Sequence, residues 1–130
     1  MTIETKRTER GWAGHFICSD RCKFRRNTLL EHGDTRIVVS TVGQMIDLFL
    51  RGKSGFGEVG LDRHFETMAF HAKHDGRYWD ADVRKQIDFG LPWSIETLDA
   101  DDLANDMHES IVAEISRRLE SGDTFPVDDD

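Results

Sequence analysis

The sequence predicts an α+β domain in which an antiparallel sheet, built from two or more hairpins, carries one long C-terminal helix on one face. Two observations predict the sheet: β-rich segments flank short turns at Gly33-Asp34 and at Asp75-Gly76. A third predicts the helix, because the last third of the chain changes to helical periodicity. The length of 130 residues fits a single domain over residues 1–130.

Composition and charge limit the classes of function. The chain is 38% hydrophobic and 32% charged, and it has no apolar run long enough to span a membrane. Its first residues, MTIETKRTERGW, lack the apolar segment of a signal peptide, so we expect a cytoplasmic location and reduced cysteines. The net charge is -8, and residues 95–130 carry twelve Asp/Glu against two Lys/Arg. This balance argues against direct nucleic-acid binding and fits a partner protein with a basic surface, although a solvated helix face and an acidic tail over 123–130 explain the same charges.

The first hairpin follows a polar N-terminus, residues 1–10, which we expect to be frayed. The segments Lys23–Glu31 and Thr35–Val42 flank its turn at Gly33-Asp34. The second segment contains a continuous β-branched run, which is typical of a central strand covered on both faces. Counting outward from the turn predicts the pairs Glu31–Arg36, Leu30–Ile37, Leu29–Val38 and Thr28–Val39.

The next region is the least regular part of the sequence. Gln44–Leu50 is apolar and short, which fits either a helix or a strand. Residues 51–60 contain four glycines and predict a surface loop rather than regular structure. This loop is either a plain connection, which we favour, or a lid or partner-binding loop.

The second hairpin is predicted over Phe65–Val83. With Asp75 and Gly76 as the two turn residues, counting outward places His71 opposite Asp80. We expect the apolar face of this hairpin to pack on the helix. That face would consist of Met68, Phe70, Ala72, Trp79, Ala81 and Val83.

The other face of this hairpin holds the main candidate for chemistry. A carboxylate opposite an imidazole can fix its tautomer and raise its pKa, as in a general base. His71, Asp80 and Asp82 are therefore the candidate catalytic residues of a small metal-dependent, hydrolase-like enzyme. The alternative, which we favour, is a cross-strand charge pair on a solvated face, because no nucleophile or oxyanion donor is visible nearby.

The C-terminal helix is predicted over about Asp101–Ser121. Acids at its start and Arg117 and Arg118 near its end complement the helix dipole, and Gly122 is a typical C-terminal cap. An apolar residue recurs every four positions, at Leu103, Met107, Ile111, Ile115 and Leu119. The candidate partner-binding residues are the acids Asp99, Asp101, Asp102, Asp106 and Glu109.

One local set of residues resembles a metal site. His15, Cys18 and Cys22 have the spacing H-x2-C-x3-C, whereas structural zinc sites use four ligands. We favour the alternative that Cys18 is a buried thiol and Cys22 a loop residue. No cofactor-binding motif occurs in the sequence, so we predict no cofactor.

Two blocks of the sequence resemble small proteins encoded by phages, prophages and related mobile elements. The first is RGWAGHFICSDRCKFRRNTLL running into RIVVSTVG, and the second is FETMAFHA running into YWDADV. The resemblance covers roughly residues 10–93 and the C-terminal helix, and it transfers no functional residue. It implies a setting in which small acidic proteins often inhibit host defence machinery by binding rather than by catalysis.

The leading hypothesis from the sequence is therefore a non-enzymatic, anti-defence protein of phage or mobile-element type. It would bind and inhibit a host protein or complex through the acidic helix and the exposed hairpin face. The first alternative is the hydrolase-like enzyme described above. The second is a structural or assembly protein that forms a homodimer through a sheet edge.

Overall fold

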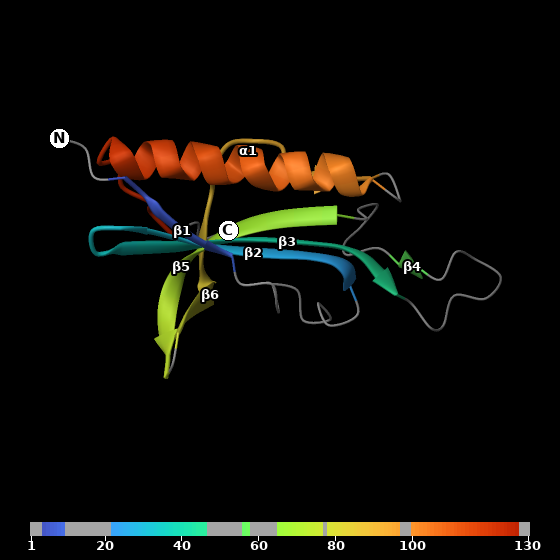
Figure 1. Ribbon diagram of the computed structural model, residues 1–130, viewed down its shortest axis with the longest axis horizontal. Coiled ribbons are helices and arrows are strands. Elements are labelled where there is room, and N and C mark those ends of the chain that lie inside the picture. The colour runs from blue at the N-terminus through green and yellow to red at the C-terminus, as the bar shows by residue number, and fades with distance from the viewer. Residues whose placement is uncertain are drawn as a thin grey trace.

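The computed structural model describes residues 4–9, 22–46, 56–57, 65–76, 78–96 and 100–127. One helix crosses one face of a twisted β-sheet (Figure 1). Predictions that concern other residues, including His15, Cys18 and Asp99, lie outside the described part of the chain. The elements are β1 (Lys6–Glu9), β2 (Cys22–His32), β3 (Thr35–Ile46), β4 (Phe56–Gly57), β5 (Phe65–Asp75), β6 (Tyr78–Ile87), β7 (Ser94–Ile95) and α1 (Asp101–Glu120).

Within the described residues, seven strands form one antiparallel sheet. The main strand order is β1-β2-β3-β5-β6, with β4 paired to β3 and β7 paired to β5. The predicted α+β class is confirmed, since α1 lies across this sheet (Figure 1). Part of the glycine-rich segment forms the short strand β4, whereas its composition predicts a loop. No helix in the described ranges is long and apolar enough to cross a membrane.

The β2–β3 hairpin forms with the predicted register. Gly33 has a φ of 58°, which a two-residue hairpin turn requires. The three consecutive β-branched residues Ile37, Val38 and Val39 are almost fully buried, because β3 is central and both of its faces are covered. The predicted pairs Glu31–Arg36, Leu30–Ile37, Leu29–Val38 and Thr28–Val39 all occur.

The β5–β6 hairpin also forms, but its predicted register is wrong, because each cross-strand pair is shifted by two residues. Asp75 pairs with Tyr78, so the turn begins one residue later than predicted. Gly76, with a φ of 67°, takes the first turn position instead of the second. Glycine satisfies a primed turn at either position, so the turn sequence alone does not select the register. The shift places Lys73, and not His71, opposite Asp80.

A large bulge interrupts β6. Ala72 pairs with Ala81, whereas Phe70 pairs with Gln86, so residues 82–85 stand opposite a single residue of β5. The Asp82 carboxylate accepts a hydrogen bond from the backbone N–H of Arg84 at 3.2 Å, which closes the bulge on itself. The prediction that Val83 faces the core is wrong, since Val83 is 58% exposed on this bulge.

The helix α1 begins and ends close to the predicted limits. Asp101 and Asp102 lie in its first turn, and Arg117 and Arg118 lie in its last. Its C-terminus is a Schellman motif: the N–H of Gly122 donates to the Leu119 carbonyl at 3.2 Å, and the N–H of residue 123 donates to the Arg118 carbonyl at 3.0 Å. The predicted C-terminal cap at Gly122 is therefore confirmed, with a φ of 81°.

The core lies between α1 and the sheet face opposite to the one predicted. Ala69 pairs with Val39 and His71 with Ile37, so the odd-numbered residues of β5 point towards the helix. The predicted packing face, with Met68, Phe70 and Ala72, is thus on the other side of the sheet. The core cluster contains Leu30, Ile37, Val39, Ala69, Ile87, Phe89, Ile111, Val112, Ile115, Leu119 and Phe125.

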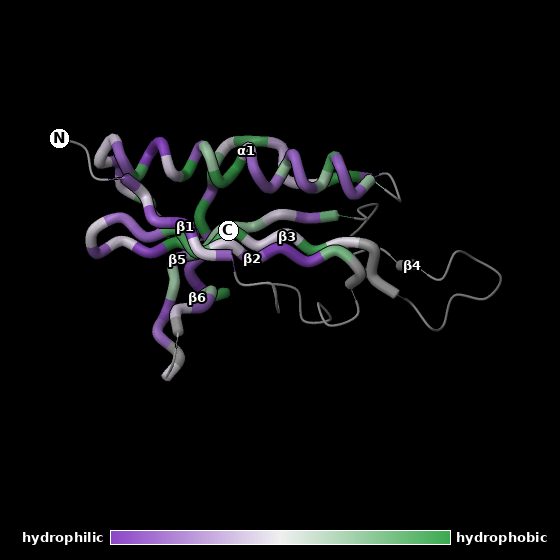
Figure 2. The backbone as a smooth tube through the Cα atoms, in the orientation of Figure 1, coloured by the Kyte–Doolittle hydropathy of each residue, from purple (hydrophilic) through white to green (hydrophobic). Residues whose placement is uncertain are grey.

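The helix stripe packs on this core over most of its length, but not at its first position. Ile111, Ile115 and Leu119 are at most 4% exposed, whereas Leu103 is 58% exposed. Figure 2 shows that hydrophobic and hydrophilic residues alternate along α1, as expected for an amphipathic helix. The first turn of α1 therefore leaves an apolar side chain at the surface.

Candidate functional site

The predicted catalytic residues of the β5–β6 hairpin do not form one constellation. His71 Nε2 lies 2.6 Å from the carbonyl oxygen of Phe125, and Asp80 accepts a hydrogen bond from the backbone N–H of Ala81 at 2.8 Å. Asp82 is bound to Arg84, whose backbone N–H holds the pKa of Asp82 below its usual value. The facing His–Asp arrangement on which the catalytic prediction depends is absent from these residues.

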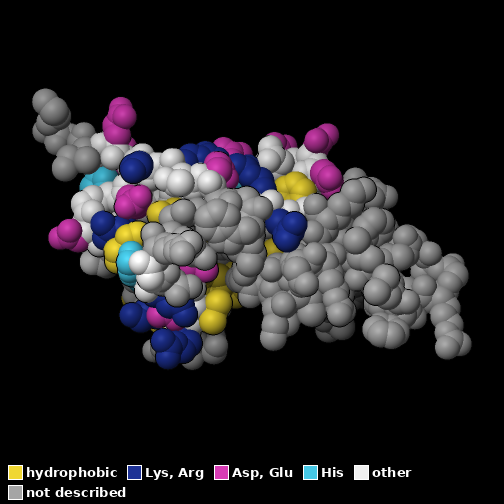
Figure 3. All heavy atoms as spheres, turned by 60° about the horizontal axis from the view of Figure 1, so that its bottom comes forward, with side chains coloured by type: hydrophobic (Ala, Val, Ile, Leu, Met, Phe, Trp, Pro, Cys, Tyr) yellow, Lys and Arg dark blue, Asp and Glu magenta, His cyan; other side chains and the backbone are white. Residues whose placement is uncertain are grey.

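His71 lines two cavities, of about 410 and 400 Å³, and neither of them includes Asp80 or Asp82. The second of these cavities contains Trp79, over whose ring the Arg36 guanidinium lies at 4.3 Å from the centroid. Lys and Arg side chains gather at the lower left of Figure 3, around this hairpin. This part of the molecule is a basic surface with one stacked aromatic residue. Among the described residues, Asp123 lines one of these cavities with His71, and Asp34 lines the other.

Of the three predicted metal ligands, the structure describes only Cys22. His15 and Cys18 lie outside the described residues. Cys22 begins β2, where it pairs with Met45 rather than lying in the loop that the sequence favours. A metal site at His15, Cys18 and Cys22 stays a prediction.

The predicted acidic surface divides into two groups. Asp101, Asp102 and Asp106 are exposed on the first half of α1, and Asp99 lies outside the described residues. Glu109, in contrast, accepts hydrogen bonds from Arg7 at 2.9 Å and from Arg26 at 2.7 Å. Its charge is neutralised within the protein, whereas Asp102 and Asp106 are exposed and placed to meet a partner.

Glu109 belongs to a polar network that joins α1 to the sheet. Arg26 also binds Glu9 at 2.7 Å, and Glu9 accepts a hydrogen bond from the Thr28 hydroxyl at 2.9 Å. Next to Thr28, the fully buried His108 lies on the helix side that faces the sheet. Its Nε2 is 2.7 Å from the Thr28 hydroxyl, and its Nδ1 is 2.7 Å from the hydroxyl of Thr41.

The direction of each hydrogen bond in this network can be deduced. Thr28 has one hydroxyl hydrogen and donates it to Glu9, so it accepts from His108 Nε2–H. In a neutral imidazole Nδ1 is then an acceptor, and Thr41 donates to it. Thr41 in turn accepts from Thr67, whose hydroxyl lies 2.6 Å away. His108 is therefore held as the Nε2–H tautomer with both nitrogens satisfied.

The pKa values follow from these contacts. Burial lowers the pKa of His108 to about 4, so the imidazole is neutral at pH 7. Hydrogen bonds from Arg7 and Arg26 lower the pKa of Glu109 to about 2. For Glu9, burial opposes ionisation, but hydrogen bonds from Arg7 and Thr28 still hold its pKa below the usual value. The network at pH 7 thus contains two carboxylates, two guanidinium groups and one neutral histidine.

Glu9, His108 and Glu109 bring ligand atoms within 4.8 Å of one another, which raises the question of a metal site. Both carboxylates are already occupied by Arg7 and Arg26, and both histidine nitrogens bond to threonine hydroxyls. A divalent cation would have to displace two guanidinium groups and break the threonine contacts. We therefore interpret the cluster as a network that joins α1 to the sheet strands β1 and β2.

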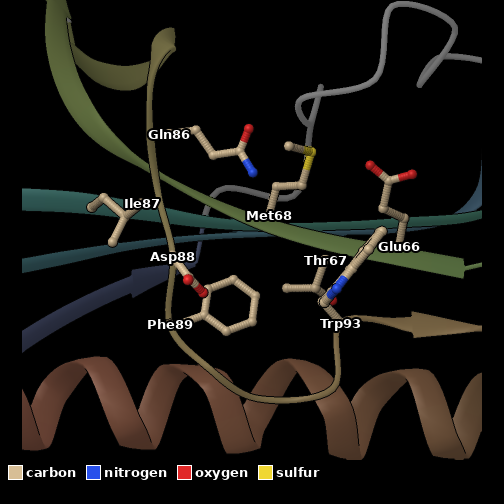
Figure 4. Close-up of a pocket in the computed structure, with 8 residues that line it drawn as sticks. All are labelled: Glu66, Thr67, Met68, Gln86, Ile87, Asp88, Phe89 and Trp93. Carbon is tan, nitrogen blue, oxygen red and sulfur yellow. The ribbon is translucent and has the colours of Figure 1, made fainter. Parts of the chain in front are cut away.

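A cavity of about 360 Å³ lies at the edge of the sheet, where β6 ends and the chain leaves it before returning as β7 (Figure 4). We call it the edge cavity. Two of its residues are carboxylates, Glu66 and Asp88, and two are large aromatic residues. It is lined by Glu66, Thr67, Met68, Gln86, Ile87, Asp88, Phe89 and Trp93.

A second cavity, of about 420 Å³, lies between α1 and the segment that follows the edge cavity. We call it the helix groove. The exposed Leu103 is part of its wall, and so is Asp106 one turn further along α1. Its lining is mainly apolar: Leu91, Pro92, Ser94, Ile95, Leu103, Asp106, Met107 and Ser110.

No protein-family model, curated protein or solved structure matches this chain. The class of protein that the fold defines is an open antiparallel α+β sheet domain with one helix. Because one fold supports many functions, the function has to come from the site itself. The surface on both sides of residues 88–95 combines cavities, exposed apolar residues and carboxylates, and it is the candidate functional site.

Sequence patterns do not reveal this site. Leu103 fits the four-residue repeat of the buried stripe, so its exposure depends on where the sheet ends beneath α1. Trp93 follows Pro92, and this pair is typical of a turn. The one available signal is composition, since Gly90, Pro92 and Trp93 interrupt the strand pattern beside an acidic helix start.

Proposed function

We propose that the protein is a non-enzymatic binding module that holds a basic, partly apolar segment of another protein in the helix groove. The observation that carries this proposal is Leu103, an apolar residue that is 58% exposed in the wall of an apolar groove. Exposed apolar surface with a polar rim is typical of protein-interaction sites.

The shape of the groove favours an apolar anchor from the partner. Leu91, Pro92 and Ile95 form one wall, and Leu103 and Met107 extend from α1 on the other side. A leucine-sized side chain placed between these walls would remove apolar surface from water on both partners. An amphipathic helix laid into a groove is one familiar form of such a contact.

The charges around the groove favour a basic partner. Asp106 lines the groove and Asp102 is exposed one turn earlier on α1, while no Lys, Arg or His is among the described residues of the groove. Glu109 contributes little to this field, because Arg7 and Arg26 neutralise it. Asp102 and Asp106 would attract and orient a basic segment, with an effect that weakens as salt is raised.

The wider setting stays a prediction. The resemblance to phage and mobile-element proteins, the inhibition of a host protein, the cytoplasmic location and the homodimer are not decided by the groove. The hydrolase-like alternative has no support from the positions of His71, Asp80 and Asp82, which each contact other groups.

The test uses short synthetic amphipathic peptides that carry Arg and Leu on opposite faces, with fluorescence anisotropy as the measurement. We expect Leu103→Ser to weaken binding by about tenfold, because the buried part of a leucine side chain contributes ~1.5 kcal/mol. Val83→Ser is the matched control, since Val83 is also 58% exposed but lies on the β6 bulge.

The charge contribution is tested with the same peptides. Asp102→Asn with Asp106→Asn should reduce affinity at low salt and flatten its salt dependence, whereas Asp123→Asn, an exposed acid beyond the helix, should have little effect. Equal losses in the Leu103 and Val83 variants would show that the acidic protein attracts basic peptides without using the groove, and the proposal would be wrong. Binding that persists in all groove variants would exclude it as well.

A further inference from the structure

We infer that the segment held in the helix groove belongs to a second copy of this chain, and that it is the β6 bulge with Val83 as its apolar side chain. This inference rests on the proposed function, because it names the occupant of the groove. The contact is heterologous, since the groove of one copy receives the bulge of the next and the two surfaces differ.

Two apolar side chains are unusually exposed. Val83 and Leu103 are each 58% exposed, more than any other large apolar side chain among the described residues. Leu103 lies in the wall of the helix groove, whereas Val83 lies on the β6 bulge. In Figure 1, α1 begins at the right and the β5–β6 hairpin extends at the lower left, so Val83 cannot reach the groove of its own molecule. Only another molecule can bring these two side chains together.

The β6 bulge is a short projection with a fixed shape. Residues 82–85 stand opposite a single residue of β5, so the chain is pushed out of the strand there. Asp82 is buried, and its carboxylate accepts hydrogen bonds from the backbone N–H of Arg84 at 3.2 Å and from the Arg84 side chain at 3.4 Å. Val83, Arg84 and Lys85 are exposed. Because the bulge is held in shape before it binds, little conformational entropy is lost on binding.

The bulge has the composition that the groove favours. Val83 supplies an apolar side chain, and the basic residues Arg84 and Lys85 follow it directly. Asp82 balances part of the Arg84 charge, but the Arg84 side chain is still 83% exposed. Lys and Arg side chains gather around the whole hairpin in Figure 3. The surface of this protein therefore contains a basic, partly apolar segment of the kind proposed for the partner.

The helix groove offers complementary groups to each part of the bulge. Its volume of about 420 Å³ exceeds that of a valine side chain, so the alkyl stems of Arg84 and Lys85 can pack beside Val83 on its apolar walls. Asp106 lines the groove, and Asp102 is exposed one turn earlier on α1. The charged ends of the two basic side chains meet these carboxylates at the rim of the groove, which fixes the orientation of the bulge.

The geometry of this contact determines the kind of assembly. In a pair of copies, one groove and one bulge stay free, so further copies add in the same way and form an open chain or a closed ring. The net charge of -8 makes whole copies repel one another at long range. We therefore expect a weak association that depends on concentration rather than a permanent oligomer.

The test is sedimentation velocity of the full protein at increasing concentration. We expect the wild type to pass from monomer to dimer and then to larger species. Val83→Ser and Leu103→Ser should each weaken this association about tenfold, because each removes one apolar side chain of the contact. Val127→Ser is the matched control, since Val127 is an exposed valine outside the bulge and the groove.

An equimolar mixture of the Val83→Ser and Leu103→Ser variants distinguishes this contact from a symmetric dimer. The first variant keeps an intact groove, and the second keeps an intact bulge. The mixture should therefore form dimers as readily as the wild type, but no larger species. Both substitutions replace exposed side chains, so the fold is retained.

A wild type that stays monomeric, association unchanged by Val83→Ser, or a mixture that recovers no dimer would each overturn the inference. The amphipathic peptides separate this failure from a failure of the proposed function. Val83→Ser keeps its own groove, so it should still bind the peptides. Peptide binding that depends on Leu103 in a monomeric protein would exclude the second copy and retain the groove, whereas peptide binding that ignores Leu103 would contradict the proposed function itself.

Discussion

Gly43 shows how one residue can be required for space rather than for backbone freedom. It lies on β3 opposite Phe65 of β5, and the Phe65 ring occupies the position that a Cβ atom on Gly43 would take. The ring also packs edge-on against Phe24, with centroids 5.7 Å apart. Three strands therefore depend on the absence of a side chain at residue 43.

Replacing Gly43 by Ala should destabilise the protein by about 1–3 kcal/mol, because the Phe65 ring would have to leave its place in a closely packed region. Urea denaturation monitored by circular dichroism measures this loss. In a Phe65→Leu background the additional cost of Gly43→Ala should become smaller, since the shorter side chain leaves room. An undiminished cost in that background would contradict the steric explanation.

Residue-scale chemistry also explains why the predicted His71–Asp80 pair does not form. The turn of the β5–β6 hairpin begins one residue later than predicted, which shifts each cross-strand pair by two residues and places Lys73 opposite Asp80. His71 points towards the helix side of the sheet, because the odd-numbered face of β5 is the one that packs on α1, and its Nε2 lies against the carbonyl of Phe125. The acid–base hypothesis depends on a register that the sequence does not determine.

At the scale of elements, the two hairpins show what a sequence can and cannot predict. For β2–β3, the turn and the hydrophobic pattern indicate the same register, and the structure has it. For β5–β6, the apolar alternation of Trp79, Ala81 and Val83 continues into residues 82–85, which in fact form a bulge. A bulge depends on contacts with the rest of the sheet and on the turn made by Asp82, so local alternation could not reveal it.

The candidate site, like the bulge, depends on tertiary packing that local sequence patterns do not reveal. The apolar spacing of α1 correctly predicts the helix, and its exposed N-terminal acids are identifiable from sequence. The helix groove and the edge cavity, however, arise where β6 stops and β7 begins, and this depends on tertiary packing. Sequence periodicity describes elements, whereas these cavities lie between elements.

The end of α1 allows a test at this scale. Gly122 has a φ of 81°, and no other atom lies within 4 Å of a Cβ placed on it, so only its backbone conformation favours glycine. Gly122→Ala should therefore destabilise the protein by about 1 kcal/mol, measured by thermal or urea unfolding. Ser121→Ala is the control, because residue 121 has an ordinary helical φ of -82°. An equal loss at both positions would point to contacts rather than to the Schellman turn.

At the scale of the whole molecule, the polar network around His108 connects more elements than any single apolar contact described above. It includes Glu9 of β1, Thr28 of β2, Thr41 of β3, Thr67 of β5 and His108 of α1. Buried polar groups cost free energy unless every donor and acceptor is paired, and both nitrogens of His108 are paired. The network therefore makes the position of the helix on the sheet specific.

Exposed acidic and basic residues lie on different parts of the molecule. Asp102 and Asp106 are exposed on the first half of α1, while Lys73, Arg84 and Lys85 are exposed on the β5–β6 hairpin. In Figure 1, α1 begins at the right and the hairpin extends at the lower left, so the two surfaces are far apart. A basic partner would approach the acidic end, which is also where the helix groove lies.

The neutral state of His108 predicts how the stability of the whole protein depends on pH. Its pKa is about 4 in the folded protein, whereas an unperturbed histidine, which represents the unfolded chain, has a pKa of 6.5. Between these values the unfolded chain binds more protons than the folded one, so stability is complete above pH ~6.5 and decreases as the pH falls towards ~4. The expected loss from this one group is about 3 kcal/mol over that window.

Urea unfolding at pH 7, 5.5 and 4 measures this dependence, and His108→Gln provides the comparison because glutamine does not titrate. The variant should be less stable than the wild type at pH 7, since the paired imidazole is lost, but it should lose less stability as the pH falls from ~6.5 to ~4.5. Glu9 and Glu109 have lowered pKa values, so the stability that they contribute is lost at lower pH, as the pH falls below ~4.5. Wild type and variant should therefore have similar slopes below pH ~4. Parallel curves across the whole range would show that His108 titrates like an exposed histidine and that the network does not hold it neutral.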